Sequence, residues 1–202
     1  MGLIGGIPLA RLVQRQLGRR SQRSGAWVAF VCGNALLWGM MALLFLPSVF
    51  QALLAGGFVS CLLALSVIDW HTYEIPVVYP LVIGVLGALR LWANPSSWCS
   101  ACIGSVCISL PLLVLLLVSR GRAIGGGDIK LLAACGFFLG WKQLCFGFFA
   151  GCLFASVIHL ARMHLVHAPR VLAFGPYLSL GMYSALLCME PLLQWYCSLW
   201  MG

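Results

Sequence analysis

Residues 49–76 have the sequence VFQALLAGGFVSCLLALSVIDWHTYEIP, a long apolar run that ends at an aspartate. The first twenty residues, Val49 to Ile68, contain no charged side chain. A helix of about 20 apolar residues is long enough to cross the hydrocarbon core of a bilayer. The run therefore predicts a transmembrane helix with an ionisable group, Asp69, at one end.

Similar apolar runs fill most of the chain. Hydrophobic residues make up 62% of the 202 residues and charged residues only 8%, whereas a soluble domain is about 25% charged. We predict an all-α fold, a polytopic transmembrane helix bundle of about seven spans, with residues 1–202 as a single membrane-embedded domain. The expected spans are Ala26–Leu46, Val49–Ile68, Val77–Ala93, Trp98–Val118, Ile129–Gly140, Leu144–Ala161 and Val171–Met189, with Met1–Leu17 as a further, partial helix.

The basic residues predict an orientation. The chain has twelve Lys and Arg against four acids, a net charge of +8. If the segment before Ala26 is cytoplasmic, ten basic residues fall on the inner side and two, Arg90 and Lys142, on the outer side. Cytoplasmic loops carry such an excess of positive charge, and basic loops also attract anionic lipid headgroups. We therefore expect membrane lipid as a partner, and no nucleic acid.

Asp69 and Asp128 are the only aspartates in the chain, and each lies where an apolar run meets polar sequence. In the predicted orientation Asp69 ends an inward-running helix, and Asp128 begins an outward-running helix after the next cytoplasmic loop. Both carboxylates then lie at the cytoplasmic boundary. Ionisable groups in a membrane cost about 2.5–3.5 kcal/mol at a helix centre, so their presence favours a function. Two neighbouring carboxylates can share one proton and act as an acid/base pair on water.

Each aspartate also has a simpler explanation. Asp69 could be solvated, or paired with Arg120, Arg122 or Lys130, and Asp128 could cap a helix after a flexible hairpin. An alternative function also fits the pair: a proton- or ion-coupled membrane transporter that uses the same aspartates. Transporters, however, place such groups near the bilayer midplane and not at its boundary.

Three glycines, Gly125, Gly126 and Gly127, come directly before Asp128. Without Cβ atoms they could take positive φ and let a substrate backbone approach the carboxylate. Their N–H groups, near a helix N-terminus, could also bind a developing oxyanion.

Several stretches resemble the motifs of one family, the type IV prepilin peptidases. The resemblance is carried by Gly125-Gly126-Gly127-Asp128-Ile129-Lys130-Leu131, which matches the Gly-x-Gly-Asp motif, by Asp69 with Ile75-Pro76, by Phe174-Gly175-Pro176-Tyr177-Leu178, which is similar to the Phe-Gly-Pro motif, and by Gly2-Leu3-Ile4-Gly5-Gly6 with Arg15. It covers essentially the whole chain. A single glycine motif has little specificity, but three motifs in the right order are specific.

The resemblance implies an aspartic endopeptidase of the bacterial inner membrane. Such an enzyme removes the short basic leader of prepilins or pseudopilins on the cytoplasmic side, just before the hydrophobic helix of the substrate. Asp69 and Asp128 would be the catalytic pair, and Lys130 would stabilise the charge of the site.

The same resemblance implies that Phe174, Gly175 and Pro176 shape a substrate groove. Glu74 is expected on the cytoplasmic loop, either as a solvated carboxylate or as a contact for the basic leader. A non-catalytic scaffold of a secretion or pilus machine remains a further alternative.

The chain departs from many members of this family. Those members carry paired cysteines in a cytoplasmic loop after the first helix and also methylate the new N-terminus, but residues 18–25 contain no cysteine. The close pair Cys99 and Cys102 is expected on the opposite side, where a disulfide is one option. We therefore expect a peptidase without the cysteine domain, without a metal or cofactor, and with doubtful methyltransferase activity. Val77 also stands where relatives often have an acid or amide.

Overall fold

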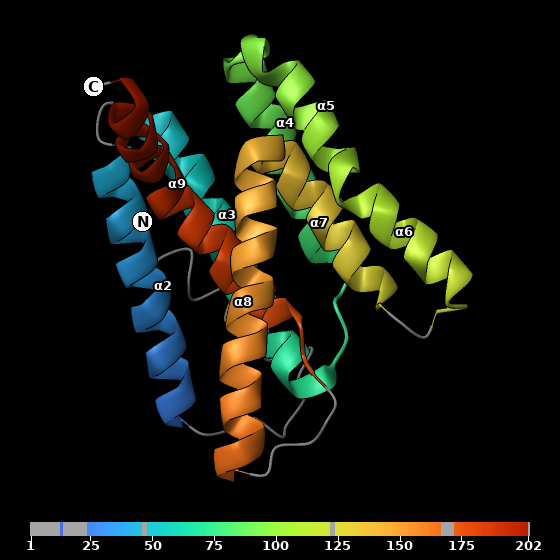
Figure 1. Cartoon of the computed structure of the whole chain (residues 1–202). Coiled ribbons are helices and arrows are strands. Elements are labelled where there is room, and N and C mark those ends of the chain that lie inside the picture. Colours follow the sequence, from blue (N-terminus) through green and yellow to red (C-terminus); the bar gives the residue numbers. More distant parts are fainter. Residues whose placement is uncertain (1–12, 14–23, 46–47, 122–123, 167–171, 202) are drawn as a thin grey trace.

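The computed structural model describes residue 13 and residues 24–45, 48–121, 124–166 and 172–201. Within these ranges the chain is built from helices and contains no strand, which confirms the all-α prediction (Figure 1). The expected helix Met1–Leu17 lies outside them, apart from Val13, which is buried.

Each expected span contains at least one helix, but several bounds differ, most of all at α9, which ends at Met201 and not at Met189. The helices are α2 (Ser24–Leu44), α3 (Val49–Thr72), α4 (Val78–Ala93), the short 3-10 helix η2 (Pro95–Ser97), α5 (Trp98–Cys107), α6 (Ser109–Val118), α7 (Gly126–Leu139), α8 (Trp141–Val166) and α9 (Gly175–Met201).

Three of the described helical stretches are long and apolar enough to cross a membrane: Val49–Thr72, Pro95–Val118 and Trp141–Leu165. Two shorter apolar helices, Phe30–Leu44 and Val78–Ala93, accompany them. The protein is thus an integral membrane protein. The number of spans, and the expectation that residues 1–202 form a single domain, stay predictions.

The C-terminal end of α3 differs from the prediction. The helix continues past Ile68 for another turn, to Thr72, so Asp69 lies inside its last turn. It ends at Tyr73, which takes a left-handed φ of 55° and donates its N–H to the carbonyl of Asp69 over 2.9 Å. Asp69 is therefore held in regular helical backbone.

Two prolines have different effects. Pro111 lacks the N–H that would bond to the carbonyl of Cys107, and the expected span is split there into α5 and α6. Pro176 was expected inside a helix from Val171, but α9 begins at Gly175, so this proline lies in the first turn. There its missing N–H removes no intrahelical bond.

The helices form two groups, visible in Figure 1. In one, α9 packs along α8 and against α3, which also contacts α2; in the other, α4, α5 and α6 surround α7. The groups meet where α3 contacts α4 and where α7 and α5 contact α8. At the start of α5, Cys99 and Cys102 are free thiols.

Glycines produce the tightest helix contacts. A Cβ on Gly181 of α9 would collide with the carbonyl of Gly147 and would lie 2.7 Å from Cα of Gly151, both in α8. Gly104 of α5 and Gly136 of α7 approach each other's backbone in the same way. Helices in lipid gain little from hiding apolar surface, so close backbone approach at small residues is a main source of their association.

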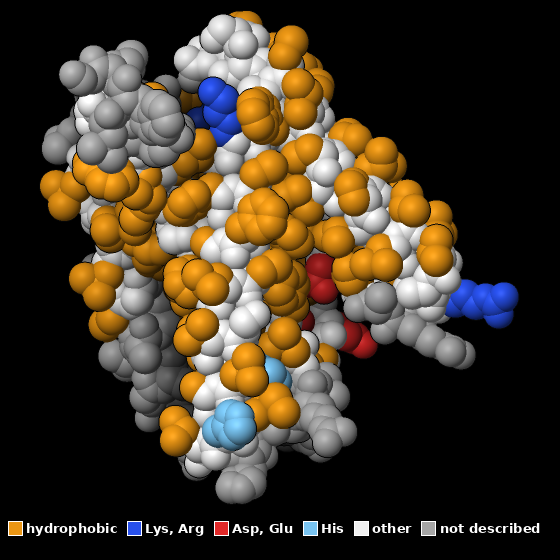
Figure 2. All heavy atoms as spheres, in the orientation of Figure 1, with side chains coloured by type: hydrophobic (Ala, Val, Ile, Leu, Met, Phe, Trp, Pro, Cys, Tyr) orange, Lys and Arg blue, Asp and Glu red, His pale blue; other side chains and the backbone are white. Residues whose placement is uncertain are grey.

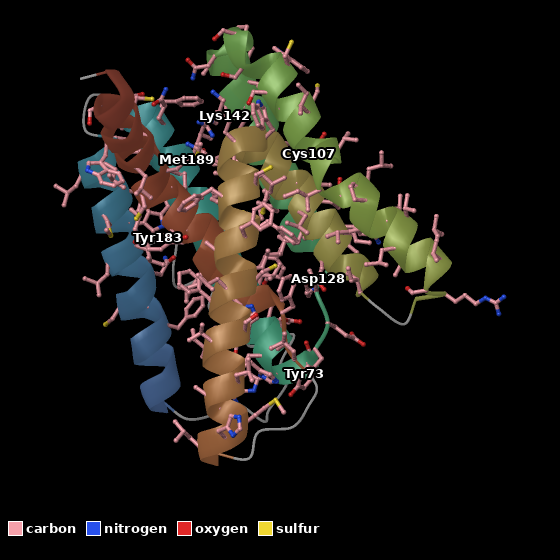
Figure 3. The ribbon with its side chains drawn as sticks, viewed as in Figure 1. Tyr73, Cys107, Asp128, Lys142, Tyr183 and Met189 are labelled. Atoms are coloured by element: carbon pink, nitrogen blue, oxygen red, sulfur yellow. The ribbon has the colours of Figure 1, made fainter. Side chains whose placement is uncertain are left out.

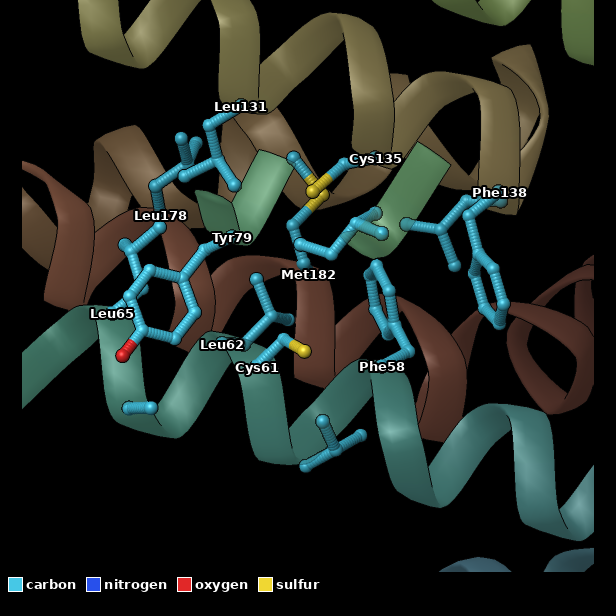
Figure 4. Close-up of a cluster of buried hydrophobic side chains, with 14 of the residues drawn as sticks. Phe58, Cys61, Leu62, Leu65, Tyr79, Leu131, Cys135, Phe138, Leu178 and Met182 are labelled. Carbon is cyan, nitrogen blue, oxygen red and sulfur yellow. The ribbon is translucent and has the colours of Figure 1, made fainter. Parts of the chain in front are cut away.

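A buried core joins the helices α3, α4, α7 and α9 (Figure 4). The rings of Phe58 in α3 and Phe138 in α7 are stacked, with centroids 4.4 Å apart. Leu65 of α3, Leu131 of α7 and Met182 of α9 are fully buried in the same cluster. The relative positions of α3, α7 and α9 are therefore set by one core.

A polar network connects α2 to α3 at mid-helix. The indole N–H of Trp38 donates to the Ser60 hydroxyl, and that hydroxyl donates to Oδ1 of the fully buried Asn34, both over 2.7 Å. Side-chain hydrogen bonds between membrane helices contribute about 0.6–2 kcal/mol each. This network aligns α2 on α3.

Candidate active site

Asp69 lies in the last turn of α3 and is only 4% exposed. Its Oδ2 accepts a hydrogen bond of 2.8 Å from the backbone N–H of Gly175, the first residue of α9. A helix N-terminus carries partial positive charge, so this contact favours the ionised carboxylate. Within the described ranges Asp69 makes no ion pair, neither with Arg120 nor with Lys130, whereas Arg122 lies outside those ranges.

Asp128 is the third residue of α7 and is half-buried. The structure brings it close enough to Asp69 for the two carboxylates to interact electrostatically. The two acids come from different helix groups, α3 and α7. Figure 3 labels Asp128 in the first turn of α7, and the acidic side chains in Figure 2 gather in this region, below a largely apolar belt.

The glycine run adopts ordinary backbone conformations and makes no use of the positive φ that glycine permits. Gly125 has a φ of −72°, and Gly126 and Gly127 belong to the first turn of α7. The requirement at Gly127 is space, because a Cβ there would lie 2.8 Å from Cβ of Ile75. The loop that follows α3 therefore packs directly on the start of α7.

The Phe-Gly-Pro segment completes the site. A Cβ on Gly175 would lie 2.7 Å from Oδ2 and 3.0 Å from Cγ of Asp69. Phe174 packs against the core, and Pro176 is half-buried in the first turn of α9. Three motifs that are far apart in the sequence thus meet at one place.

Lys130 lies in α7, two residues after Asp128, and Glu74 lies just after the end of α3. Both side chains are exposed, and neither makes an ion pair with any residue that the structure describes. Glu74 belongs to the loop after α3, where its backbone N–H and carbonyl bond to the Thr72 hydroxyl over 3.3 Å. Their proposed roles toward the site stay predictions.

One neighbour of the site was not expected from the sequence. The guanidinium of Arg162 in α8 lies over the ring of Trp70, 4.3 Å from its centroid, and donates to the Tyr177 hydroxyl over 3.5 Å. Arg162 was explained by membrane topology alone. Trp70 follows Asp69 and Tyr177 follows Pro176, so only their positions beside the motifs could have drawn attention to them.

Comparison with known proteins gives a consistent result. Residues 56–160, just over half of the chain, match the family described as "Type IV leader peptidase family", and both aspartates lie in that range. The prepilin leader peptidase/N-methyltransferase of Bacillus subtilis (strain 168) is 31% identical over 150 residues, which is 72% of this chain and 59% of that protein.

Two further relatives bear the same name. The one from Aeromonas salmonicida is 32% identical over 171 residues (80% of this chain, 54% of the relative), and the one from Burkholderia pseudomallei (strain K96243) is 36% identical over 162 residues (75% and 50%). The chain thus spans about half the length of the curated relatives it matches. No solved structure matches it.

Proposed function

The chain belongs to the type IV leader peptidase family, and from this we propose that it is an aspartic endopeptidase that cleaves the basic leader from prepilin or pseudopilin precursors. Two observations support the proposal: the N–H of Gly175 bonds to Asp69 over 2.8 Å, and Ile75, in the loop that follows Asp69, packs against Gly127, the residue before Asp128. We propose that cleavage takes place at the cytoplasmic face of the bacterial inner membrane, on the basis of the distribution of basic residues.

In the proposed mechanism the two carboxylates hold one proton between them, because two adjacent negative charges repel each other. We assign the ionised form to Asp69, since the N–H of Gly175 and the N-terminus of α9 favour negative charge there. Asp69 then takes a proton from water, and the oxygen attacks the scissile carbonyl carbon. The proton of Asp128 passes to the carbonyl oxygen, which gives a neutral gem-diol.

Collapse of the gem-diol breaks the C–N bond. One gem-diol hydroxyl returns its proton to Asp128, and the proton held by Asp69 passes to the leaving amine. The pair thereby returns to its initial state with one proton. The proposed function is this hydrolysis alone and does not include the methyl transfer named for the relatives, of whose length the chain spans about half.

The proposal is tested by cleavage of a tagged prepilin-type substrate in membranes that contain wild type, Asp69→Asn or Asp128→Asn at matched levels. Both variants should lose cleavage and remain inserted, because an amide cannot take or donate the proton. Glu190→Gln in α9 makes the same chemical change away from the two motifs and should retain cleavage. If both asparagine variants cleave normally, the peptidase pair is refuted and ion flux in substrate-free liposomes becomes the next measurement.

A further inference from the structure

Arg162 joins three helices close to the candidate active site. It belongs to α8, its guanidinium lies 4.3 Å from the ring centroid of Trp70 in α3, and it donates to the hydroxyl of Tyr177 in α9 over 3.5 Å. Trp70 directly follows Asp69, and Tyr177 is two residues after Gly175. The two partners of Arg162 thus flank the two ends of the hydrogen bond between Gly175 and Asp69.

That hydrogen bond depends on a close approach of α3 and α9. The N–H of Gly175 lies 2.8 Å from Oδ2 of Asp69, and such a bond needs a distance of about 2.7–3.2 Å between its heavy atoms. A shift of α3 against α9 by about 1 Å would therefore break it. Any contact that fixes the end of α3 against the start of α9 also fixes the orientation of Asp69.

Arg162 makes such a contact because it reaches both helices from a third one. Within the described residues α8 packs along α9, and α3 packs on α9 but hardly on α8. Trp70 lies about 100° further round α3 than Asp69, so its ring can face Arg162 while the carboxylate faces α9. Trp70 is 41% exposed and Tyr177 only 4%. The guanidinium therefore ties a loosely packed side chain of α3 to a firmly packed one of α9.

These contacts indicate that Arg162 acts through its neighbours. Among the described residues its partners are the two aromatic side chains, and it forms no ion pair with either aspartate. A planar guanidinium can stack on an indole and donate from its edge at the same time. Its effect on Asp69 is therefore one of position.

We propose that Arg162 is a positioning residue of the peptidase, which holds the last turn of α3 against the first turn of α9 so that the N–H of Gly175 stays on Asp69. This role rests on the proposed function. Arg162 lies outside residues 56–160, the part of the chain that matches the family. Loss of the guanidinium leaves both carboxylates in place but Asp69 poorly oriented, which lowers the rate of the chemical step more than it weakens substrate binding.

The first test compares two arginines that make similar contacts. Arg90 in α4 lies 5.2 Å from the ring centroid of Phe138 and donates to the carbonyl of that residue over 2.5 Å. Phe138 is ten residues, or about 15 Å, along α7 from Asp128. Arg162→Gln should lower kcat for a prepilin-type substrate about tenfold with KM within about twofold, whereas Arg90→Gln should lower thermal stability and leave kcat within about twofold. Equal kcat values for the two variants would overturn the proposal.

A double-mutant cycle shows whether Arg162 acts through the contact between Gly175 and Asp69. In a Gly175→Ala background that contact is already disturbed, so Arg162→Gln should lower kcat further by less than about twofold. A full tenfold loss in that background would mean that the two residues act independently, and it would refute the proposal.

The conservative variant separates charge from shape. Arg162→Lys keeps the positive charge but loses the planar fork, so its kcat should stay below about half of the wild-type value. Full wild-type kcat in this variant would contradict the role assigned to the planar contact.

A smaller change covers the case in which Arg162→Gln does not fold. Tyr177→Phe removes only the hydroxyl that accepts from Arg162 and should lower kcat about threefold. Tyr79→Phe in α4 is the control, because it removes a buried hydroxyl that has no partner among the described residues, and its kcat should be unchanged. Equal kcat values for these two variants would argue against the proposal. Wild-type enzyme without any cleavage would instead refute the proposed function, so the two failures are distinct.

Discussion

Replacement of Gly175 by alanine should displace Asp69 in the candidate active site while the fold stays intact. The new Cβ would lie 2.7 Å from Oδ2, 3.0 Å from Cγ and 3.1 Å from Cβ of Asp69. These distances are shorter than ordinary van der Waals contacts, and they involve the whole side chain, so rotation of the carboxylate alone cannot relieve them. The aspartate must move, and its 2.8 Å bond to the backbone N–H lengthens or breaks.

The size of the effect follows from that bond. A hydrogen bond to a charged group contributes about 1.5–3 kcal/mol, and a shift of about 1 Å in a catalytic group can reduce the rate about 100-fold. We therefore expect kcat of Gly175→Ala to fall about 100-fold, with KM within about threefold, since the change acts on the orientation of Asp69.

The assay is time-resolved cleavage of a prepilin-type substrate in detergent or liposomes, with stability measured in parallel. Gly84→Ala in α4 is the matched control, because a Cβ there meets nothing within 4 Å and alanine is the better helix former. A Gly175→Ala enzyme with near-normal kcat would refute the role that we assign to this contact. A KM effect without a kcat effect would also contradict it.

Three further changes test the packing. Ser60→Ala removes a hydrogen-bond partner of Asn34 and should reduce the stability of the protein by about 1–2 kcal/mol while cleavage is retained. Thermal unfolding in detergent measures this loss, and an unchanged Tm would contradict the role of the network. Gly181→Leu forces α9 away from α8 and should reduce the yield of folded protein sharply, whereas normal yield and Tm would show that this contact is dispensable. Arg162→Lys loses the planar contact with Trp70 and should reduce the stability of the protein by about 1 kcal/mol. In a Trp70→Leu background the same substitution should reduce stability by less, and additive losses would argue against the stacking interaction.

Much of the fold could be predicted from the sequence because membrane helices follow apolar length. Each expected span with described residues contains a helix, and orientation and order along the chain predict that Asp69 and Asp128 lie at the same boundary of the membrane. The division of one span at Pro111 was open, since proline in a membrane helix can produce a kink or a break.

The details of the site depended on tertiary packing. The N–H of Gly175 reaches Asp69 across 106 residues, and no local pattern indicates which backbone group will be near a carboxylate. The need for glycine at position 127 arises from Ile75, whose contact with α7 exists only in the folded chain.

The order in which the site's parts occur along the chain has a consequence for biosynthesis. Asp69 leaves the ribosome first, Asp128 follows after the next helical hairpin, and the Gly175 N–H that orients Asp69 comes last, at the start of α9. A nascent chain that has inserted only α2 to α7 holds both acids but lacks the group that positions one of them. Under the proposed function we expect proteolytic competence to arise late, when the final helix docks, and we expect a translation product that ends before α9 to be inactive.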